Sequence, residues 1–239
     1  MSLTDQRVVV LGGTSGLGLA TADLVARRGA RVTVASSRAD SAERALATLP
    51  AGTTAEVVDL TDGDLVAALF DRLGPVDHLV FTAGEPLALT PLADLDLDAA
   101  RRLFTLRYFG ALDAVRAAAP RLRPGGSVTL TSGTAGLRPG PGWSVAASIC
   151  GAVEALVRAL AVELAPIRVN AVRAGVIRTP LWSGLPDADR EQLYAATAAG
   201  LPLGRIGEPE DAAEAYAYLM EQRFATGTVV TVDGGTLLA

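Results

Sequence analysis

The sequence contains no lysine, and all 21 of its basic residues are arginine. A guanidinium stays protonated at physiological pH, so an arginine can bind or orient an anion but cannot shuttle a proton. Histidine occurs once, as His78, and tyrosine occurs four times. No lysine is therefore available for proton transfer anywhere in this chain.

Cysteine also occurs only once, as Cys150, which excludes an intramolecular disulfide and is consistent with a reducing cytosol. The first residues, MSLTDQR, lack the basic and then apolar pattern of a secretory signal. No uninterrupted apolar run approaches the ~18 residues that span a bilayer. The net charge is −5, with both signs interspersed, so no nucleic-acid or membrane partner is expected. We expect a cytoplasmic protein.

The 239 residues are half hydrophobic but only 5% aromatic, which favours buried parallel strands covered by alanine-rich helices. Short runs rich in Val, Ile or Thr alternate with longer helical patterns. We therefore predict a single Rossmann-type α/β domain over 1–239, a doubly wound parallel sheet of about seven strands flanked by helices. The predicted strands are 8–11, 32–35, 55–58, 78–82, 127–131, 167–171 and 228–232. The predicted helices are 18–28, 41–48, 63–72, 97–121, 144–164 and 209–221.

The segment 179–203 is long for a connection and contains two glycines and several prolines. Loops of this length in compact domains are often substrate lids, and the alternative is an ordered surface excursion. We predict a lid over 179–203.

Gly12, Gly16 and Gly18 form a G-x-x-x-G-x-G pattern between a predicted strand and a predicted helix. Small residues there let the backbone approach a pyrophosphate, whose charge then lies at the helix N-terminus. Thr14, Ser15 and Leu17 complete the predicted phosphate-binding turn. The alternative is that these glycines only shape a turn.

The second predicted strand ends with Ser36, Ser37 and Arg38. An acidic residue there would bind a ribose 2′-hydroxyl and repel a 2′-phosphate. Two hydroxyls and a guanidinium instead suit a dianionic phosphate, which favours NADP(H) over NAD(H). Arg38 could equally be a solvated surface charge.

The chain resembles the short-chain dehydrogenase/reductase family from near its start to its end. The motifs that carry this resemblance are the glycine turn at 8–18, VVDL at 57–60, VDHLVFTAG at 76–84, GSVTLTS at 126–132, IRVNAVRAGVIRTP at 167–180, LGRIGEPEDAA at 203–213 and GTVVTVDGG at 227–235.

The resemblance implies cofactor-binding roles at six further positions. It places Asp59 and Leu60 beside the adenine, Ala83 and Gly84 along the cofactor, and Ile177 and Thr179 at the nicotinamide carboxamide. From the residues alone, Asp59 could be a turn carboxylate and Thr179 a turn residue before a proline.

The resemblance also implies a reactive serine, a tyrosine thirteen residues later that transfers the proton, and a lysine four residues beyond that lowers the tyrosine pKa. Ser132 fits the serine position, but the other two positions fall on Val145 and Ile149. Arg107 stands where the family has an asparagine. Ser132 and Arg107 are thus the catalytic candidates, and Val145 and Ile149 would form an apolar wall unless they are core positions.

Three functions follow from this pattern. The first is an atypical oxidoreductase that binds NADP(H), with an anionic or activated substrate at Arg107 and a proton from water, the substrate or a lid residue such as Tyr194. The second is a non-enzymatic dinucleotide-binding sensor or partner protein, and the third is a relic of the fold. His78 and Cys150 are interpreted as structural. The apolar faces of the two long predicted helices, 97–121 and 144–164, predict a homotetramer or homodimer. The resemblance implies a small carbonyl or alcohol as the substrate of an active enzyme.

Overall fold

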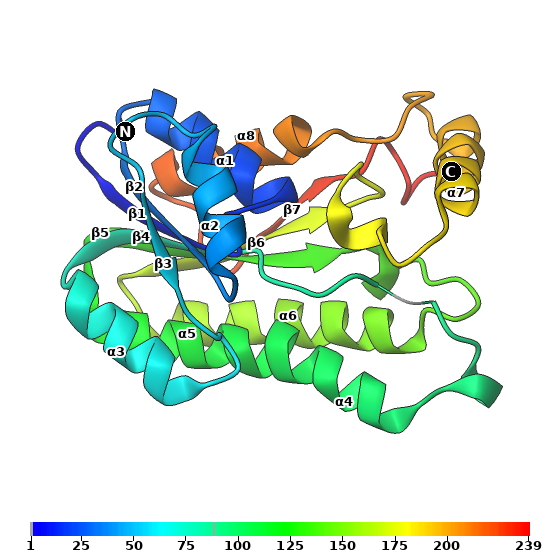
Figure 1. Ribbon diagram of the computed structural model, residues 1–239, viewed down its shortest axis with the longest axis horizontal. Coiled ribbons are helices and arrows are strands. Elements are labelled where there is room, and N and C mark those ends of the chain that lie inside the picture. Colours follow the sequence, from blue (N-terminus) through cyan, green and yellow to red (C-terminus); the bar gives the residue numbers. More distant parts are fainter. Residues whose placement is uncertain (1, 88) are drawn as a thin grey trace.

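The computed structural model describes residues 2–87 and 89–239, which form one sheet between two layers of helices (Figure 1). The seven strands lie in the order β3-β2-β1-β4-β5-β6-β7, and every neighbouring pair is parallel. The predicted doubly wound sheet is confirmed. Its strands are β1 (Arg7–Leu11), β2 (Arg31–Ser36), β3 (Thr54–Val57), β4 (Val76–Phe81), β5 (Leu122–Gly133), β6 (Arg168–Ala174) and β7 (Val229–Val232).

The helices cover both faces of the sheet, and an apolar core lies between the helices and the sheet on each face (Figure 1). One face carries α3 (Gly63–Leu73), α4 (Leu97–Phe104), α5 (Ala111–Ala118) and α6 (Ser144–Glu163), and the other carries α1 (Gly16–Arg27), α2 (Ala39–Leu46) and α8 (Pro209–Glu221). Alanine on the inner faces, for example Ala114 of α5 and Ala22 of α1, lets these helices approach the strands closely.

Two predicted segments differ from the structure. The predicted helix 97–121 is broken by a π-helical segment, η2 (Thr105–Gly110), followed by α5 and a 3₁₀ turn, η3 (Ala119–Arg121). The strand predicted over 127–131 begins earlier, because residues 124–126 lie inside β5, where the register with β4 shifts and Gly125 adopts a φ of 87°. The extra residues bulge out of the ladder there, so the turn-like composition marks a bulge and not the strand start.

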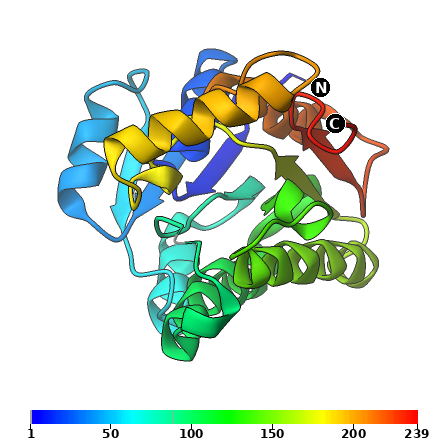
Figure 2. The same cartoon turned by 90° about the vertical axis from the view of Figure 1, so that its right-hand side faces the viewer.

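The segment 179–203 is not an open loop. It contains a 3₁₀ turn, η5 (Pro180–Trp182), and a helix that the sequence analysis missed, α7 (Asp187–Gly200). Both views place α7 at one end of the sheet, beside the C-terminus (Figures 1 and 2). The weak amphipathic pattern of α7, with Tyr194 as its one buried residue, explains why periodicity did not reveal it.

Within the part of the chain that the structure describes, α6 is the one helix long and apolar enough to cross a membrane by length and composition. It packs along the sheet through Val153, Val157 and Leu160. Core helices of water-soluble proteins can also be this long and apolar, and the apolar sequence of α6 contains the charged residues Glu154 and Arg158.

Candidate functional site

A groove of about 370 Å³ runs along the carboxyl ends of the central strands, and we call it the strand-end groove. Parallel α/β sheets bind ligands at this edge. Most of the predicted cofactor residues line it. These are Gly12, Thr14, Ser15, Gly16, Leu17, Ser36, Ser37, Asp59, Leu60, Ala83, Gly84 and Thr179. Gly18, Arg38 and Ile177 do not line the groove.

Gly18 has a packing role instead. A Cβ at this position would lie 2.3 Å from the carbonyl oxygen of Gly12 and 2.4 Å from Oγ1 of Thr82. Gly12 is itself confined, because it adopts a φ of 83° and its Cβ would lie 2.5 Å from the amide nitrogen of Ala83. The two glycines therefore bring the first turn of α1 against the ends of β1 and β4, which leaves the start of α1 open to the groove.

Arg38 lies at the start of α2 and is bound by Asp40. Its Nη2 and Nε donate to the Asp40 carboxylate at 2.7 and 3.0 Å. Arg44 donates to the same carboxylate at 2.9 Å, and the hydrogen bonds from Arg38 and then Arg44 hold the Asp40 pKa well below its usual range. The charge of Arg38 is thus compensated next to Ser36 and Ser37.

Asp59 combines both roles that the sequence left open. It lines the groove, and it also closes a turn by accepting hydrogen bonds from the backbone N–H and hydroxyl of Thr61 at 2.9 and 2.7 Å. These bonds, the backbone one first, lower the Asp59 pKa. Ile177 is buried, and its carbonyl accepts a hydrogen bond from Nε1 of Trp182 at 3.0 Å. Thr179 lies against Gly16, at the mouth of the groove.

A second, smaller cavity of about 140 Å³ adjoins the groove, and we call it the inner cavity. Leu17, Ala83, Arg107 and Leu181 belong to the lining of both spaces. The inner cavity is mainly apolar. Its walls include Leu87, Trp143, Ala146, Ile149, Leu181 and Trp182, and its polar residues include Arg107, Ser132, Thr134 and Cys150.

Ser132 is buried at the end of β5 and is hydrogen bonded to a carboxylate that the sequence analysis missed. Its hydroxyl donates to Oε1 of Glu154 on α6 at 2.8 Å. Arg173, the register partner of Ser132 on β6, donates to both Glu154 oxygens at 2.8 and 2.7 Å. A charge inside the apolar run ASICGAVEALV was the available signal for Glu154.

Burial raises the Glu154 pKa, but the hydrogen bonds from Arg173 and Ser132, together with the charge of Arg173, outweigh it and hold the pKa below its usual value. Glu154 is therefore an ionised acceptor behind Ser132 at neutral pH.

Arg107 reaches the inner cavity from the π-helical segment. Extra residues in a π turn redirect side chains, and such turns often lie at functional sites. The Arg107 Nη2 donates to the Glu85 carbonyl, and its Nε lies 3.7 Å from Oε2 of Glu85. Burial lowers the Arg107 pKa, and the Glu85 charge opposes that effect. The Nε has no hydrogen-bond partner in the structure.

The predicted apolar wall on α6 is only half right. Ile149 lines the inner cavity, and so does Trp143. Val145 instead packs against the hydrophobic core, because it faces away from the cavity on its helix. Ala146 and Cys150, which are also four residues apart, line the cavity together with Ser132. Cys150, interpreted from its apolar neighbours as a small structural residue of the core, is instead a partly buried residue of the cavity wall, and burial raises the pKa of its thiol.

Tyr194 is not positioned to supply a proton. It is buried in a small apolar cluster with Trp182, and the Arg178 guanidinium lies 4.5 Å from its ring centre. Burial raises its pKa. Among the residues that the structure describes, no tyrosine lines either the strand-end groove or the inner cavity.

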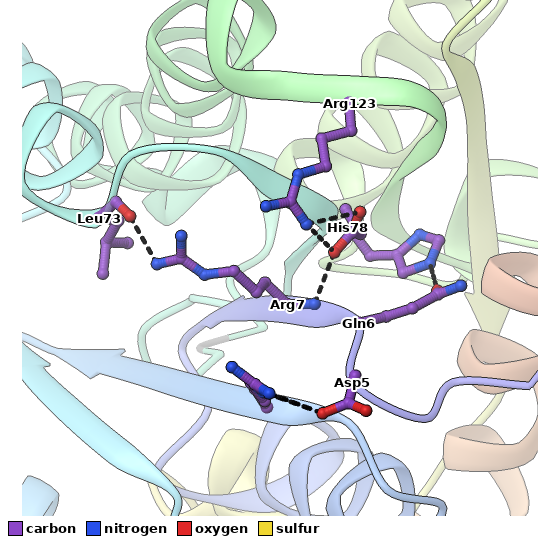
Figure 3. Close-up of polar contacts among 8 residues, drawn as sticks. Asp5, Gln6, Arg7, Leu73, His78 and Arg123 are labelled. Atoms are coloured by element: carbon purple, nitrogen blue, oxygen red, sulfur yellow. Dashed lines mark hydrogen bonds and ion pairs between the residues drawn. The ribbon is translucent and has the colours of Figure 1, made fainter.

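His78 lies near the amino end of β4, opposite the edge that carries the groove. Its ring nitrogens contact Ser127 Oγ at 2.8 Å and Gln6 Oε1 at 2.5 Å. Figure 3 shows this contact with Gln6 beside the polar cluster around Arg7. Burial and then the Arg168 charge lower the His78 pKa to about 4. His78 is a neutral structural residue.

The sheet order, the glycine-shaped groove and the adjoining cavity define a Rossmann-type nucleotide-binding α/β protein. A family model described as enoyl-(acyl carrier protein) reductase matches residues 12–236. The chain is 35% identical to the short-chain dehydrogenase/reductase malC of Malbranchea aurantiaca, over 99% of this chain and 96% of malC. It is 38% identical to the short-chain dehydrogenase/reductase ATR9 of Stachybotrys chlorohalonatus, over 99% of each. The chain belongs to the short-chain dehydrogenase/reductase family of oxidoreductases.

Solved structures agree with this assignment. The structure of MalC, a reductase/Diels-Alderase, superposes with a TM-score of 0.92 at 33% identity, covering 99% of this chain and 98% of MalC. A small-chain dehydrogenase in complex with NADPH superposes with a TM-score of 0.84 at 34% identity, covering 98% of this chain and 100% of the dehydrogenase. A short-chain oxidoreductase from Pseudomonas aeruginosa PAO1 with an atypical catalytic centre superposes with a TM-score of 0.89 at 29% identity, covering 99% of this chain and 98% of the oxidoreductase.

Proposed function

We propose that this protein binds NADP(H) in the strand-end groove and acts on a small molecule in the inner cavity without a tyrosine–lysine pair. The observation that carries the proposal is the junction of the two spaces. Arg107 lines both spaces and Ser132 lines the inner cavity, while no tyrosine from the described residues lines either space and the sequence has no lysine. Relatives of the same fold include a complex with NADPH and an enzyme with an atypical catalytic centre.

The groove fits a dinucleotide on structural grounds. Gly12 and Gly18 tolerate no Cβ, so the backbone of the first turn is exposed where a pyrophosphate would lie at the start of α1. We assign Thr14 and Ser15 to the phosphates, Ser36, Ser37 and Arg38 to a 2′-phosphate, and Asp59 and Leu60 to the adenine. Bound NADP(H) would supply or accept a hydride at the inner-cavity end.

The proton transfer is the atypical step. Within the chain, we place the positions that a tyrosine and a lysine would hold at Ala146 and Cys150, because both line the cavity and they are four residues apart. The spacing of thirteen residues then places the family's serine position at Gly133, which also lines the cavity, and Ser132 is its neighbour. Neither an alanine nor a thiol with a raised pKa replaces a positioned general base. The proton therefore comes from water or from the substrate itself. Arg107 orients an anionic or polarised group of the substrate.

The segment 179–203 is proposed as a lid on this cavity. Leu181 and Trp182 from η5 line the inner cavity, and the Leu181 carbonyl accepts a hydrogen bond from the Leu87 amide at 2.8 Å. The lid thus contacts the segment after β4 across the cavity mouth, where closure would exclude water.

We also propose a homodimer or homotetramer in the cytoplasm. Leu97 on α4 and Phe109 beside it are 60% and 54% exposed, and Val162 on α6 is 80% exposed. Apolar surface of this kind on α6 and on the segment formed by α4 and η2 suits packing against a second copy. Light scattering that detects only a 24.5 kDa species would contradict the assembly.

The test separates binding from turnover. Titration of NADPH and NADH into the purified protein, followed by fluorescence and by the rise in melting temperature, should give saturable binding with a preference for NADPH. NADPH consumption should then be measured with a panel of aldehydes, ketones and imines. Binding with no turnover would favour a dinucleotide-binding sensor instead, and absence of binding would contradict the proposal.

A further inference from the structure

The Ser132 hydroxyl has a single proton, and the structure offers it two acceptors. Oε1 of Glu154 lies 2.8 Å from Oγ, whereas the carbonyl oxygen of Cys150 lies at 3.4 Å. A hydrogen bond to an ionised carboxylate is shorter and stronger than one to a neutral carbonyl. The proton of Ser132 therefore lies on the Glu154 side, and the free lone pairs of its oxygen are left for other partners.

Glu154 is also kept from donating in return. Arg173 donates hydrogen bonds to both of its oxygens, which lowers the Glu154 pKa, and the charge of Arg158 lowers that pKa further. The Glu154 and Arg173 side chains are only 9% and 13% exposed, so water competes little for this pair. A carboxylate is an acceptor only, so it cannot reverse the hydrogen bond to Ser132.

We propose that Glu154 is a positioning residue that fixes Ser132 as a hydrogen-bond acceptor toward the inner cavity, so that the site selects substrates with an O–H or N–H group on the reacting carbon. An alcohol, or the N–H of a protonated imine, can donate to the Ser132 oxygen. A bare ketone would place its lone pairs against those of Ser132, which leaves a buried acceptor unpaired. The use of the inner cavity by a substrate rests on the proposed function, whereas the orientation of the hydroxyl does not.

The binding test uses 1-indanol with the NADPH complex and 1-indanone with the NADP⁺ complex, two combinations that cannot turn over. Trp143 and Trp182 line the cavity, so their fluorescence reports binding. The ratio of the two dissociation constants is compared between variants, which cancels the difference in cofactor state. We expect the wild type to bind the alcohol roughly 3- to 10-fold more tightly, the equivalent of one net hydrogen bond.

The double variant Glu154→Leu with Arg173→Leu is the decisive one, because it removes the carboxylate that accepts the Ser132 proton and leaves no unpaired buried charge. The alcohol preference should then fall at least about threefold, since the Ser132 proton becomes free for a carbonyl. Ser132→Ala should bring the ratio near one. Ser148→Ala is the matched control, because Ser148 lies on the same helix and donates to the Ser144 carbonyl. A preference for the ketone in the wild type, or an unchanged ratio in the folded Glu154→Leu and Arg173→Leu double variant, would overturn the proposal.

A ligand-free measurement protects the test against a variant that folds poorly. In a 1:1 mixture of H₂O and D₂O, a slowly exchanging hydroxyl splits the ¹³C signal of the serine Cβ. The wild-type Ser132 should be split, and the exposed Ser148 should show one averaged line. A single averaged line for Ser132 would overturn the orientation. A failure of NADP(H) to bind would contradict the proposed function alone, because the hydroxyl measurement needs no cofactor.

Discussion

Arg107 lies directly over Gly84, and a Cβ on Gly84 would lie 2.5 Å from the guanidinium carbon of Arg107. Gly84 does not adopt a positive φ, so alanine is compatible with its backbone and meets only the side chain above it. Gly84→Ala should therefore displace Arg107 from the Glu85 carbonyl and destabilise the fold by roughly 1–3 kcal/mol. Chemical denaturation measures this change.

The coupling between the two residues is the sharper observation. In an Arg107→Ala background, Gly84→Ala should have almost no effect on stability, because the obstructing group is gone. Equal destabilisation in both backgrounds would show that Arg107 does not occupy the space over Gly84.

Gly18 and Gly151 make a matched pair of helical glycines with opposite expectations. A Cβ on Gly18 would collide with the Gly12 carbonyl at 2.3 Å, whereas a Cβ on Gly151 meets nothing within 4 Å. Gly18→Ala should lower the free energy of unfolding by about 3 kcal/mol and weaken NADPH binding. Gly151→Ala should raise the free energy of unfolding by about 0.5–1 kcal/mol. Thermal unfolding of both variants checks the pair.

Asp40 competes with any phosphate for Arg38. Asp40→Asn removes that competitor and should tighten NADPH binding about threefold, an amount typical of one surface charge contact, while leaving NADH unchanged. Asp23→Asn is the control, because Asp23 pairs with Arg27 at the spacing at which Asp40 pairs with Arg44, and Asp23 does not line the strand-end groove. Equal effects of the two variants on NADPH, or a matching gain for NADH, would argue against a 2′-phosphate at Arg38.

The sheet and the groove were predictable because they depend on local signals. A strand pattern followed by Gly12, Gly16 and Gly18 specifies the turn, and parallel strands bring their carboxyl ends together wherever they fall in the sequence. The inner cavity was less predictable. Whether Val145 or Ala146 faces it depends on the rotation of α6, which one residue of loop length changes by about 100°.

Ion pairs between residues far apart in the sequence could not be predicted, for a different reason. Glu154 and Arg173 are nineteen residues apart and meet only because α6 crosses β6 above Ser132. Neither residue carries a motif, and each could have been a surface charge. The π-helical segment at Arg107 was hidden as well, because its sequence is compatible with an ordinary helix.

His78 gives the fold a defined pH dependence. Its pKa is lowered to about 4 in the folded state from 6.5, so between these values the unfolded chain binds the proton and the folded chain does not. Stability should fall as the pH drops from 6.5 toward 4, by on the order of 3 kcal/mol from this residue. His78→Gln should flatten the curve in that window when urea unfolding is measured against pH. A parallel curve for the variant would assign the loss to other groups.

The register of α6 can be tested by rebuilding the pair that the family carries. Ala146→Tyr with Cys150→Lys places both side chains in the inner cavity beside Ser132 and should raise NADPH-dependent reduction of a simple ketone by about 10² or more. Val145→Tyr with Ile149→Lys is the matched control, in which Val145 faces the core, so it should give no gain and lower the melting temperature. Both double variants are assayed only after NADPH binding is confirmed. A gain in activity in the control alone would show that Val145 and Ile149 hold the tyrosine and lysine positions. If neither folded variant gained activity, Arg107, and not the residues on α6, would be the group that prevents ketone reduction.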